Sequence, residues 1–266
     1  MKIVTFNLHY GGHTKTGNHW QRIISEFAPD LVLVQESFHP SVYIPESENK
    51  KFEGSIVWQS LPSKWGSAIL APQHKIEDVS VPTAFEGWVA GGLIPDFSIG
   101  GVARPVMVFS VHAPSPGPYE KKVNDILDFI QKDTQDCDLL IGGDFNITTA
   151  VRHPSEELNN TKTELSILRR LKSDFGLINA WQAINPNQNL PQTLRWTGNM
   201  NAPYHCDGIF IPVSWFRYLE SCEVHTEGWS DMSDHNPIVA TFNAQHRGGA
   251  ASRTPREPLI KPDRRV

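Results

Sequence analysis

The chain has 266 residues and a mass of 29.9 kDa, with 24 Lys and Arg against 29 Asp and Glu and a formal charge of −5. Hydrophobic residues make up 39% and charged residues 20%, which predicts a globular chain and excludes one that is disordered throughout. No apolar run approaches the roughly 18–20 residues of a membrane-spanning helix. The acidic balance argues against a globally basic nucleic-acid coat but is compatible with a local basic cleft.

Apolar periodicity predicts alternating strands and helices over the first 243 residues. Residues 2–8 are rich in β-formers, the apolar positions 20, 23, 24 and 27 follow at helical spacing, and residues 31–34 form a continuous apolar run typical of a buried strand. The other predicted strands are Ser55–Gln59, Ser67–Ala71, Gly87–Leu93, Pro105–His112, Asp138–Ile141, Gly208–Pro212, Trp215–Glu223 and Pro237–Phe242. The other predicted helices are Tyr119–Ile130 and Thr163–Phe175.

The last segment, residues 244–266, has a different composition. It carries six Arg or Lys against two acidic residues, with three prolines and few large apolar side chains. Such a segment cannot bury enough apolar surface to offset the entropy of ordering, so we predict a disordered basic tail. The tail serves either solubility alone or contact with phosphate groups.

The cysteines and the first residues indicate the cellular compartment. Cys137, Cys206 and Cys222 lie far apart and form no CxxC pair, so we expect reduced thiols rather than a disulfide framework or a structural zinc site. The opening MKIVTFNLHYGG lacks the apolar core of a signal peptide, and we therefore expect a cytoplasmic location.

Polar side chains stand where the predicted strands end. They are Asn7, Glu36, His112, Asp144, Asn146, Asp207, Asp234 and His235. Any one of them alone is typical of turn chemistry, but several gathered along one rim of a sheet would form a site. Carboxylates brought together repel one another unless a hard cation lies among them, and this oxygen-rich set favours Mg²⁺ or Mn²⁺ over structural zinc.

The strings around these residues resemble a known family. They are TFNLH (5–9), LVQES (33–37), WGSAIL (65–70), VHAP (111–114), GGDFN (142–146), HCDGIF (205–210) and SDHNPI (233–238). In this order they resemble the endonuclease/exonuclease/phosphatase superfamily, with its deoxyribonuclease I-like fold. The resemblance implies an α/β fold, a four-layer sandwich of two mixed β-sheets packed face to face with helices outside. It covers residues 1–243, which we expect to form the catalytic domain.

The resemblance also implies roles in a metal-dependent hydrolysis of phosphoesters. Glu36 would be the principal ligand of the divalent metal, with Asn7 beside it and Asp234 as a possible further ligand. The metal would neutralise charge on the phosphoryl and leaving oxygens.

The remaining matched residues would act on water and phosphate. His235, oriented by Asp207, would act on the attacking water or on the phosphoryl oxygen. Asp144 would align or deprotonate the water, and Asn146 would donate to a phosphoryl oxygen. His112 would be a hydrogen-bond donor or general acid near the leaving group, and the identity of the general base stays open.

Five further residues are candidates for substrate contact: His9, Trp65, Arg104, Trp196 and His205. The two tryptophans could stack on a base or a sugar, although most tryptophans of a large sandwich belong to its core. His205 stands where many relatives carry Arg, a departure that would alter how the phosphate is held. Arg152 and Arg195 are similar candidates for phosphate contact.

Three functions compete at this point. A nuclease that cleaves DNA or RNA is favoured by the full catalytic set and the basic tail. A phosphatase or phosphodiesterase acting on a small molecule, a nucleotide or a lipid headgroup would use the same site. A non-catalytic binding module is disfavoured because every expected metal ligand and both members of the Asp207–His235 pair are present. The choice of nucleic acid and the oligomeric state stay open.

Overall fold

Two six-stranded mixed β-sheets form the centre of the molecule. The computed structural model describes residues 1–11, 13–14, 17–60, 65–114, 116–133 and 137–243, so the predicted tail lies outside the described residues. The first sheet has the order β13 (Leu219–Val224), β14 (Ile238–Phe242), β1 (Lys2–Gly11), β4 (Leu31–Ser37), β6 (Gly66–Leu70) and β5 (Ile56–Ser60). The second has the order β11 (Leu177–Asn179), β12 (Asp207–Pro212), β10 (Asp138–Asp144), β9 (Val102–His112), β8 (Val89–Ile99) and β7 (Glu77–Val79).

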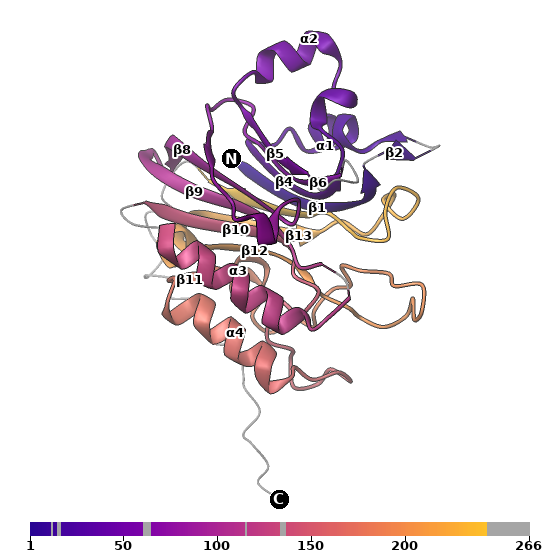
Figure 1. Cartoon of the computed structure of the whole chain (residues 1–266). Helices are drawn as coiled ribbons and strands as arrows, with labels where there is room; N and C mark the ends of the chain where they lie inside the picture. The colour runs from indigo at the N-terminus through magenta and orange to yellow at the C-terminus, as the bar shows by residue number, and fades with distance from the viewer. Residues whose placement is uncertain (12, 15–16, 61–64, 115, 134–136, 244–266) are drawn as a thin grey trace, which may run out of the picture.

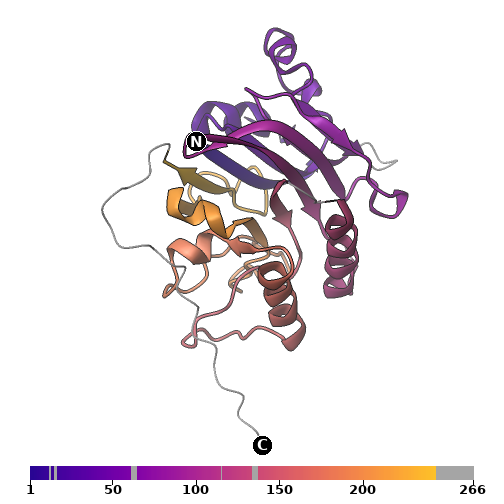
Figure 2. The same cartoon turned by 90° about the vertical axis from the view of Figure 1, so that its left-hand side faces the viewer.

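Helices cover the outer faces of both sheets, as Figures 1 and 2 show. Those of the described residues are α1 (His19–Phe27), α2 (Glu46–Asn49), α3 (Tyr119–Asp133), α4 (Lys162–Ser173) and α5 (Ala180–Ile184), with short 3-10 helices at Pro40–Val42, Lys50–Phe52, Thr83–Phe85 and Val213–Tyr218. β2 (His13–Thr14) pairs antiparallel with β3 (Gly17–Asn18). No helix of the described ranges is long and apolar enough to cross a membrane.

Three hydrophobic clusters define the layers. The inner cluster joins side chains of both sheets, such as Leu33 of β4 and Leu140 of β10. A second cluster packs α3 and α4 on the outer face of the second sheet, and a third packs Trp20 and Ile23 of α1 on the first. This order of helix, sheet, sheet and helix confirms the predicted four-layer α/β sandwich.

The helix boundaries follow from local capping. Thr161 begins α4 with a capping box, because its hydroxyl accepts from the amide of Glu164 at 3.0 Å while the Glu164 carboxylate accepts from the amide of Thr161 at 2.7 Å. Asn18 caps α1 by accepting from the amide of Gln21. Both helices then bury one apolar stripe against a sheet, as their spacing predicts.

One predicted strand is wrong in its first part. Residues 213–218 form a 3-10 helix that takes up the first four residues of the predicted strand Trp215–Glu223, and β13 begins only at Leu219. Both Trp215 and Phe216 are buried there, although neighbours in a strand would point to opposite faces. A short apolar run does not by itself distinguish a strand from a buried turn of helix. The prediction also missed β7, β11, α5 and the extension of β8 to Ile99.

Candidate active site

Polar residues replace apolar ones at one end of the layer between the sheets. On β9 the inward positions run from Val108 through Ser110 to His112, and on β10 from Leu140 through Gly142 to Asp144. Asn7 on β1 lies beside Gln35 on β4 in the same way. The Ser110 hydroxyl accepts from Gln35 Nε2 at 2.9 Å, so a polar contact between the sheets borders the site. The strand alternation therefore carries the functional side chains inward at this end.

Strand register brings three of these residues into one row. Asp144 on β10 pairs with His112 on the parallel strand β9 and with Asp207 on the antiparallel strand β12. Residues paired directly across neighbouring strands project from the same face of a sheet. The row therefore places an imidazole and two carboxylates side by side.

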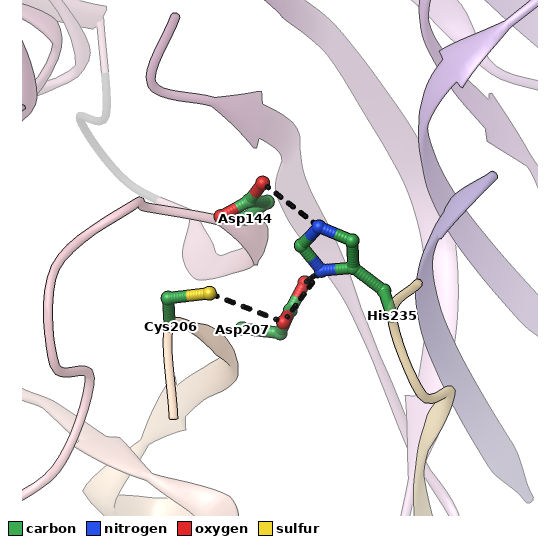
Figure 3. Close-up of side chains that lie close together, drawn as sticks. All are labelled: Asp144, Cys206, Asp207 and His235. Atoms are coloured by element: carbon green, nitrogen blue, oxygen red, sulfur yellow. Dashed lines mark hydrogen bonds and ion pairs between the residues drawn. The ribbon is translucent and has the colours of Figure 1, made fainter. Parts of the chain in front are cut away.

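His235 completes the row from the segment before β14. Its Nδ1 donates to Asp207, with distances of 3.0 Å to Oδ1 and 2.9 Å to Oδ2, and its Nε2 lies 3.7 Å from Asp144 Oδ2. Figure 3 shows the ring between the two carboxylates. Burial alone would lower the pKa of His235, but the charges of Asp207 and Asp144 and the hydrogen bond to Asp207 raise it to about 10. The imidazole is therefore protonated at neutral pH.

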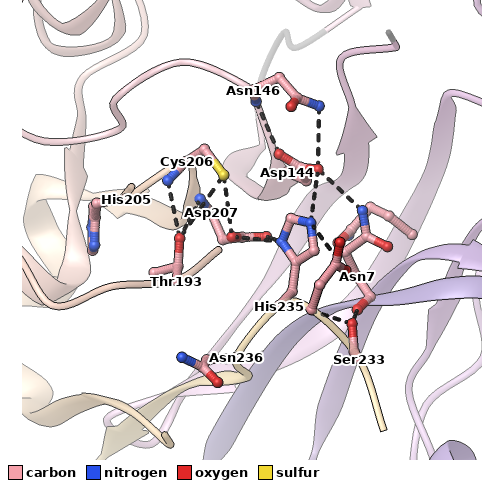
Figure 4. A network of polar contacts seen from close by, with 12 residues as sticks. Asn7, Asp144, Asn146, Thr193, His205, Cys206, Asp207, Ser233, His235 and Asn236 are labelled. Carbon is pink, nitrogen blue, oxygen red and sulfur yellow. Dashed lines mark hydrogen bonds and ion pairs between the residues drawn. The ribbon is translucent and has the colours of Figure 1, made fainter. Parts of the chain in front are cut away.

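Asp144 is the centre of the polar network in Figure 4. Its Oδ1 accepts from the amide of Asn146 at 2.9 Å, and its Oδ2 accepts from Asn7 Nδ2 at 3.0 Å and Asn146 Nδ2 at 3.3 Å. The residue is 1% exposed. Burial raises the pKa of Asp144, and the nearby His235 opposes that effect. Asp144 is thus a more basic carboxylate than an exposed one.

Glu36 and His112 lie on the other side of Asp144. Glu36 Oε1 is 3.3 Å from Asn7 Nδ2 and 3.7 Å from His112 Nε2, which in turn lies 3.7 Å from Asp144 Oδ2. The buried Nδ1 of His112 has no hydrogen-bond partner within the described residues. Rings instead surround the imidazole, since its centroid lies 5.3 Å from that of Trp88 and 6.3 Å from that of Trp65.

Three site residues adopt a left-handed backbone conformation. The φ angles are 49° at His9, 51° at Glu36 and 50° at Asn146, and Ala28 is the one other non-glycine residue of this kind in the described chain. Such angles are strained for residues with a Cβ and persist where surrounding contacts fix them. His9 and Glu36 lie in the last residues of β1 and β4, and Asn146 lies just after β10.

Asp234 and His9 form an ion pair beside the network. His9 Nδ1 lies 2.6 Å from Asp234 Oδ1, and the His9 amide donates to Asn7 Oδ1 at 3.0 Å. Burial alone would raise the pKa of Asp234, but the hydrogen bond from His9 and the charge of His235 lower it. Asp234 is therefore ionised and lies 4.0 Å from His235 Nε2.

The structure brings together all eight predicted catalytic and metal-site residues but separates the predicted substrate contacts. Trp65 is half-buried beside His112, and Trp196 is 52% exposed on the loop after residue 195. Arg104 lies near the start of β9, at the opposite end from His112, where it pairs with Asp138 at 4.0 Å. Residue 205 lies inside the protein.

The His205 side chain is 1% exposed and points away from His235 in Figure 4. Its Nδ1 donates to the carbonyl of Pro191 at 2.8 Å, and its ring packs against Trp181. Burial lowers the pKa of His205 to about 4. The interior position gives this side chain no route to a phosphate in the structure described here.

Two further arginines that the sequence suggested as phosphate contacts bond to other parts of the protein instead. Arg152 bonds Glu156 at 2.8 Å and the carbonyl of Pro203 at 3.0 Å, and it is 7% exposed. Arg195 contacts Asn236 and the carbonyls of Ser233 and His235.

Sequence reasoning missed several supporting residues. The Ser233 hydroxyl donates to the carbonyl of Asn7 at 2.8 Å and accepts from the amide of His235 at 3.0 Å, so it ties the first sheet to the Asp-His segment. Ser233 belongs to the string SDHNPI, which was a usable signal. Thr193 belongs to no recognised string, and its hydrogen bonds to the backbone of Cys206 and Asp207 are apparent only from the fold.

A group of side chains could hold a metal ion. Asp144, Cys206, Asp207 and His235 each offer one ligand atom, and these atoms lie within 4.8 Å of one another. Burial and the neighbouring carboxylates raise the pKa of Cys206 far above its ordinary value, so the thiol keeps its proton. Glu36, Asn7 and Asp234 offer oxygen atoms next to this group.

Sequence comparison gives a match over part of the chain. No protein-family model matches the chain. One curated relative is the Transposon TX1 uncharacterized 149 kDa protein of Xenopus laevis, 27% identical over 136 residues, or 51% of this chain. The match covers 10% of that protein, so the chain spans about a tenth of its length.

Solved structures match over nearly the full described length. The 3′ phosphatase NExo from Neisseria, bound to product DNA hairpin, has a TM-score of 0.70 and 18% identity, with 91% of this chain and 99% of that chain covered. The AP endonuclease from Archaeoglobus fulgidus has a TM-score of 0.65 and 19% identity, with 91% of this chain and 99% of that chain covered. The APE2 catalytic domain from Xenopus laevis has a TM-score of 0.69 and 15% identity, with 96% of this chain and 95% of that chain covered. The chain therefore shares the fold of these three structures, the deoxyribonuclease I-like α/β sandwich.

Proposed function

We propose that residues 1–243 form a divalent-metal-dependent nuclease that hydrolyses phosphodiester bonds of DNA. The observation that carries this proposal is the buried His235, protonated between Asp207 and Asp144, with Glu36 and Asn7 on the other side of Asp144. DNA is favoured as substrate because the similar structures include a 3′ phosphatase bound to a DNA hairpin and AP endonucleases.

The donor set fits a hard cation. Glu36 Oε1 and Asp144 Oδ2 both approach the same amide nitrogen of Asn7, so two carboxylates converge on one neutral donor. Mg²⁺, or Mn²⁺ in its place, prefers such oxygen ligands, whereas a protonated, buried Cys206 is a poor ligand for a softer metal. Glu36 would hold the ion with Asn7 and Asp234 nearby. When bound, the ion would neutralise charge on the phosphoryl group.

The protein's own residues divide the remaining chemistry. The protonated His235 suits donation to a phosphoryl oxygen, where negative charge develops. Asp144, whose pKa burial raises, is the better candidate to accept a proton from the attacking water. His112 and Asn146 flank it, the first as a donor toward the leaving oxygen and the second toward the phosphoryl group.

Cleavage assays test this function. Supercoiled plasmid and labelled single-stranded DNA and RNA would be incubated with Mg²⁺, with Mn²⁺ and with EDTA, using the wild type and Glu36→Ala. Glu46→Ala is a matched control, since Glu46 is exposed and pairs with Lys50. We expect cleavage of DNA that requires the metal and Glu36 but not Glu46.

The alternative substrates give a different result. Release of phosphate from small phosphoesters without cleavage of any nucleic acid, dependent on Glu36, would overturn the nuclease proposal. It would also identify the same residues as the site of a small-molecule phosphoesterase.

A further inference from the structure

A three-residue segment, Thr193–Arg195, lies between the two chain segments that carry the Asp-His pair. Leu194 forms bridges to both Tyr204 and His235. The Thr193 amide donates to the carbonyl of Tyr204 at 2.7 Å, and the Arg195 amide donates to the carbonyl of Asp234 at 2.8 Å. The segment thus joins the chain that leads into Asp207 to the chain that contains His235.

Thr193 contacts the Asp207 side of the pair. Its hydroxyl oxygen accepts from the amides of Cys206 at 3.0 Å and Asp207 at 3.2 Å, and the residue is 0% exposed. The Cys206 thiol, in turn, points at Asp207 Oδ2 from 3.6 Å. Figure 4 shows Thr193 next to Cys206 and Asp207, on the side away from Asp144. One hydroxyl therefore fixes the two consecutive peptide groups that lead into Asp207.

The same segment also contacts the His235 side. The Thr193 carbonyl accepts from the amide of Asn236 at 2.8 Å. The Arg195 guanidinium donates to the carbonyl of Ser233 at 2.5 Å, to that of His235 at 3.0 Å and to the side chain of Asn236. These bonds surround His235 in the sequence and hold its backbone.

We propose that the segment Thr193–Arg195 sets the distance and angle between Asp207 and His235, with Thr193 and Arg195 acting as positioning residues. This inference rests on the proposed function, in which the Asp207–His235 pair acts on the phosphate. The two catalytic residues come from different sheets, β12 in one and the segment before β14 in the other. Their alignment therefore needs a connection beyond the ladder of either sheet, and Thr193–Arg195 is such a connection.

The expected effects are on turnover rather than on binding. A misplacement of about 1 Å at a reacting group lowers a rate by about 10²-fold. Thr193→Val removes the hydroxyl with little change of shape and leaves the amides of Cys206 and Asp207 without their acceptor. Thr193→Ser keeps the acceptor. The Thr193 hydroxyl and the Arg195 guanidinium both bond to the protein itself, so the proposal predicts an effect on kcat with little change of KM.

The first test is kinetic. On a DNA substrate with Mg²⁺, we expect Thr193→Val and Arg195→Lys to lower kcat by about 10–100-fold with KM within about twofold of wild type. Thr193→Ser should recover most of the lost kcat. Thr241→Val is the control for the substitution itself, because Thr241 lies on β14 outside the segment. A Thr193→Val enzyme with unchanged kcat would overturn the proposal, as would a lower kcat that Thr193→Ser does not recover.

The second test needs no activity. The proton on His235 Nδ1, hydrogen-bonded to Asp207, should give a downfield NMR signal, assigned by its loss in Asp207→Ala. We expect the signal to shift or to broaden in Thr193→Val and Arg195→Lys and to persist in Thr193→Ser. A lower melting temperature with an unchanged signal would mean a merely structural role and would overturn the proposal. A wild type that cleaves no nucleic acid would contradict the proposed function, while this spectrum would still decide the positioning role.

If Thr193→Val does not fold, Arg195→Lys carries both tests from the His235 side. Lysine has one nitrogen in place of the planar fork that reaches two carbonyls and an amide oxygen. An unchanged kcat and an unchanged downfield signal in Arg195→Lys would then overturn the proposal.

Discussion

Both carboxylate oxygens of Asp207 face one ring nitrogen of His235, at 3.0 and 2.9 Å. The two residues are 28 positions apart: Asp207 begins β12 of the second sheet, and His235 lies in the segment that leads into β14 of the first. Their contact is therefore a property of the packed molecule, absent from either sheet alone. It holds the imidazole in its charged form next to Asp144.

Asp207→Asn should remove most of the activity without unfolding the protein. The amide keeps the size of the side chain but loses the charge that raises the pKa of His235, so less of the imidazole is protonated at neutral and higher pH. We expect kcat/KM to fall by about 10²–10⁴-fold, the range of a lost acid–base contribution. Steady-state kinetics of DNA cleavage at pH 7 and pH 8.5 would measure this loss. Asp128→Asn, at an exposed carboxylate that pairs with Arg170, should leave the rate unchanged.

Trp65 should stabilise substrate by stacking. The indole is half-buried, contacts the rings of His112 and Trp88, and belongs to none of the three hydrophobic clusters. Stacking of one base on an aromatic side chain is worth about 1–3 kcal/mol, so Trp65→Ala should raise KM by about 5–150-fold and Trp65→Phe by much less. Oligonucleotides that lack a base beside the scissile bond provide the check. Equal losses on intact and base-free substrates would contradict stacking.

His205 should make the protein less stable in acid. Its pKa is lowered by burial to about 4 in the folded state, against an ordinary value of 6.5. Between these values the unfolded chain binds a proton that the folded protein does not, so this group lowers the free energy of unfolding as pH falls from 6.5 to 4. The expected contribution is up to about 3 kcal/mol.

Urea unfolding at pH 6.5, 5.5 and 4.5 would measure this dependence. His205→Asn retains a donor for the carbonyl of Pro191 but does not titrate, so its stability should fall less steeply with acid. Parallel pH profiles for wild type and variant would contradict the assignment.

Gly143→Ala should destabilise the fold more than Gly176→Ala. Its φ angle is +149°, and a Cβ there would lie 1.9 Å from the carbonyl oxygen of Val111 on β9. Relief of that overlap would separate β10 from β9 and move Asp144, at an expected cost of about 3 kcal/mol or more. Gly176→Ala is the control, since its φ of +65° is strained but the space is open, and about 1 kcal/mol is expected. Thermal unfolding of both variants distinguishes the overlap from backbone strain, and equal losses would argue against the overlap.

Most of the strand-end residues could be predicted from sequence for a physical reason. Buried runs such as residues 31–34 and 138–141 mark strands, and a polar residue directly after such a run must lie at the end of a strand. Register then decides which ends are neighbours. The resemblance assigned His112, Asp144 and Asp207 to one site, but the pairing of Asp144 with both of the others could not be derived from any single strand.

The sequence predictions that failed concern residues whose surroundings come from distant parts of the chain. His205 follows an exposed loop in sequence, yet Trp181 and Pro191 enclose it in the fold. Arg195 resembles a free cation until the carbonyls of Ser233 and His235 are seen around it. Arg104 could have been placed correctly, because eight residues of strand carry it about 26 Å from His112.

The arrangement of the site also bears on how this protein could be altered. His112, Asp144 and Asp207 are fixed by the hydrogen-bond ladders of β9, β10 and β12. Trp65, in contrast, directly precedes β6, and Trp196 lies on an exposed loop. Replacements at the two tryptophans disturb few ladder bonds and little buried core. Libraries that vary positions 65 and 196–203 should therefore yield many folded variants with changed substrate preference, while libraries at the ladder residues should yield few.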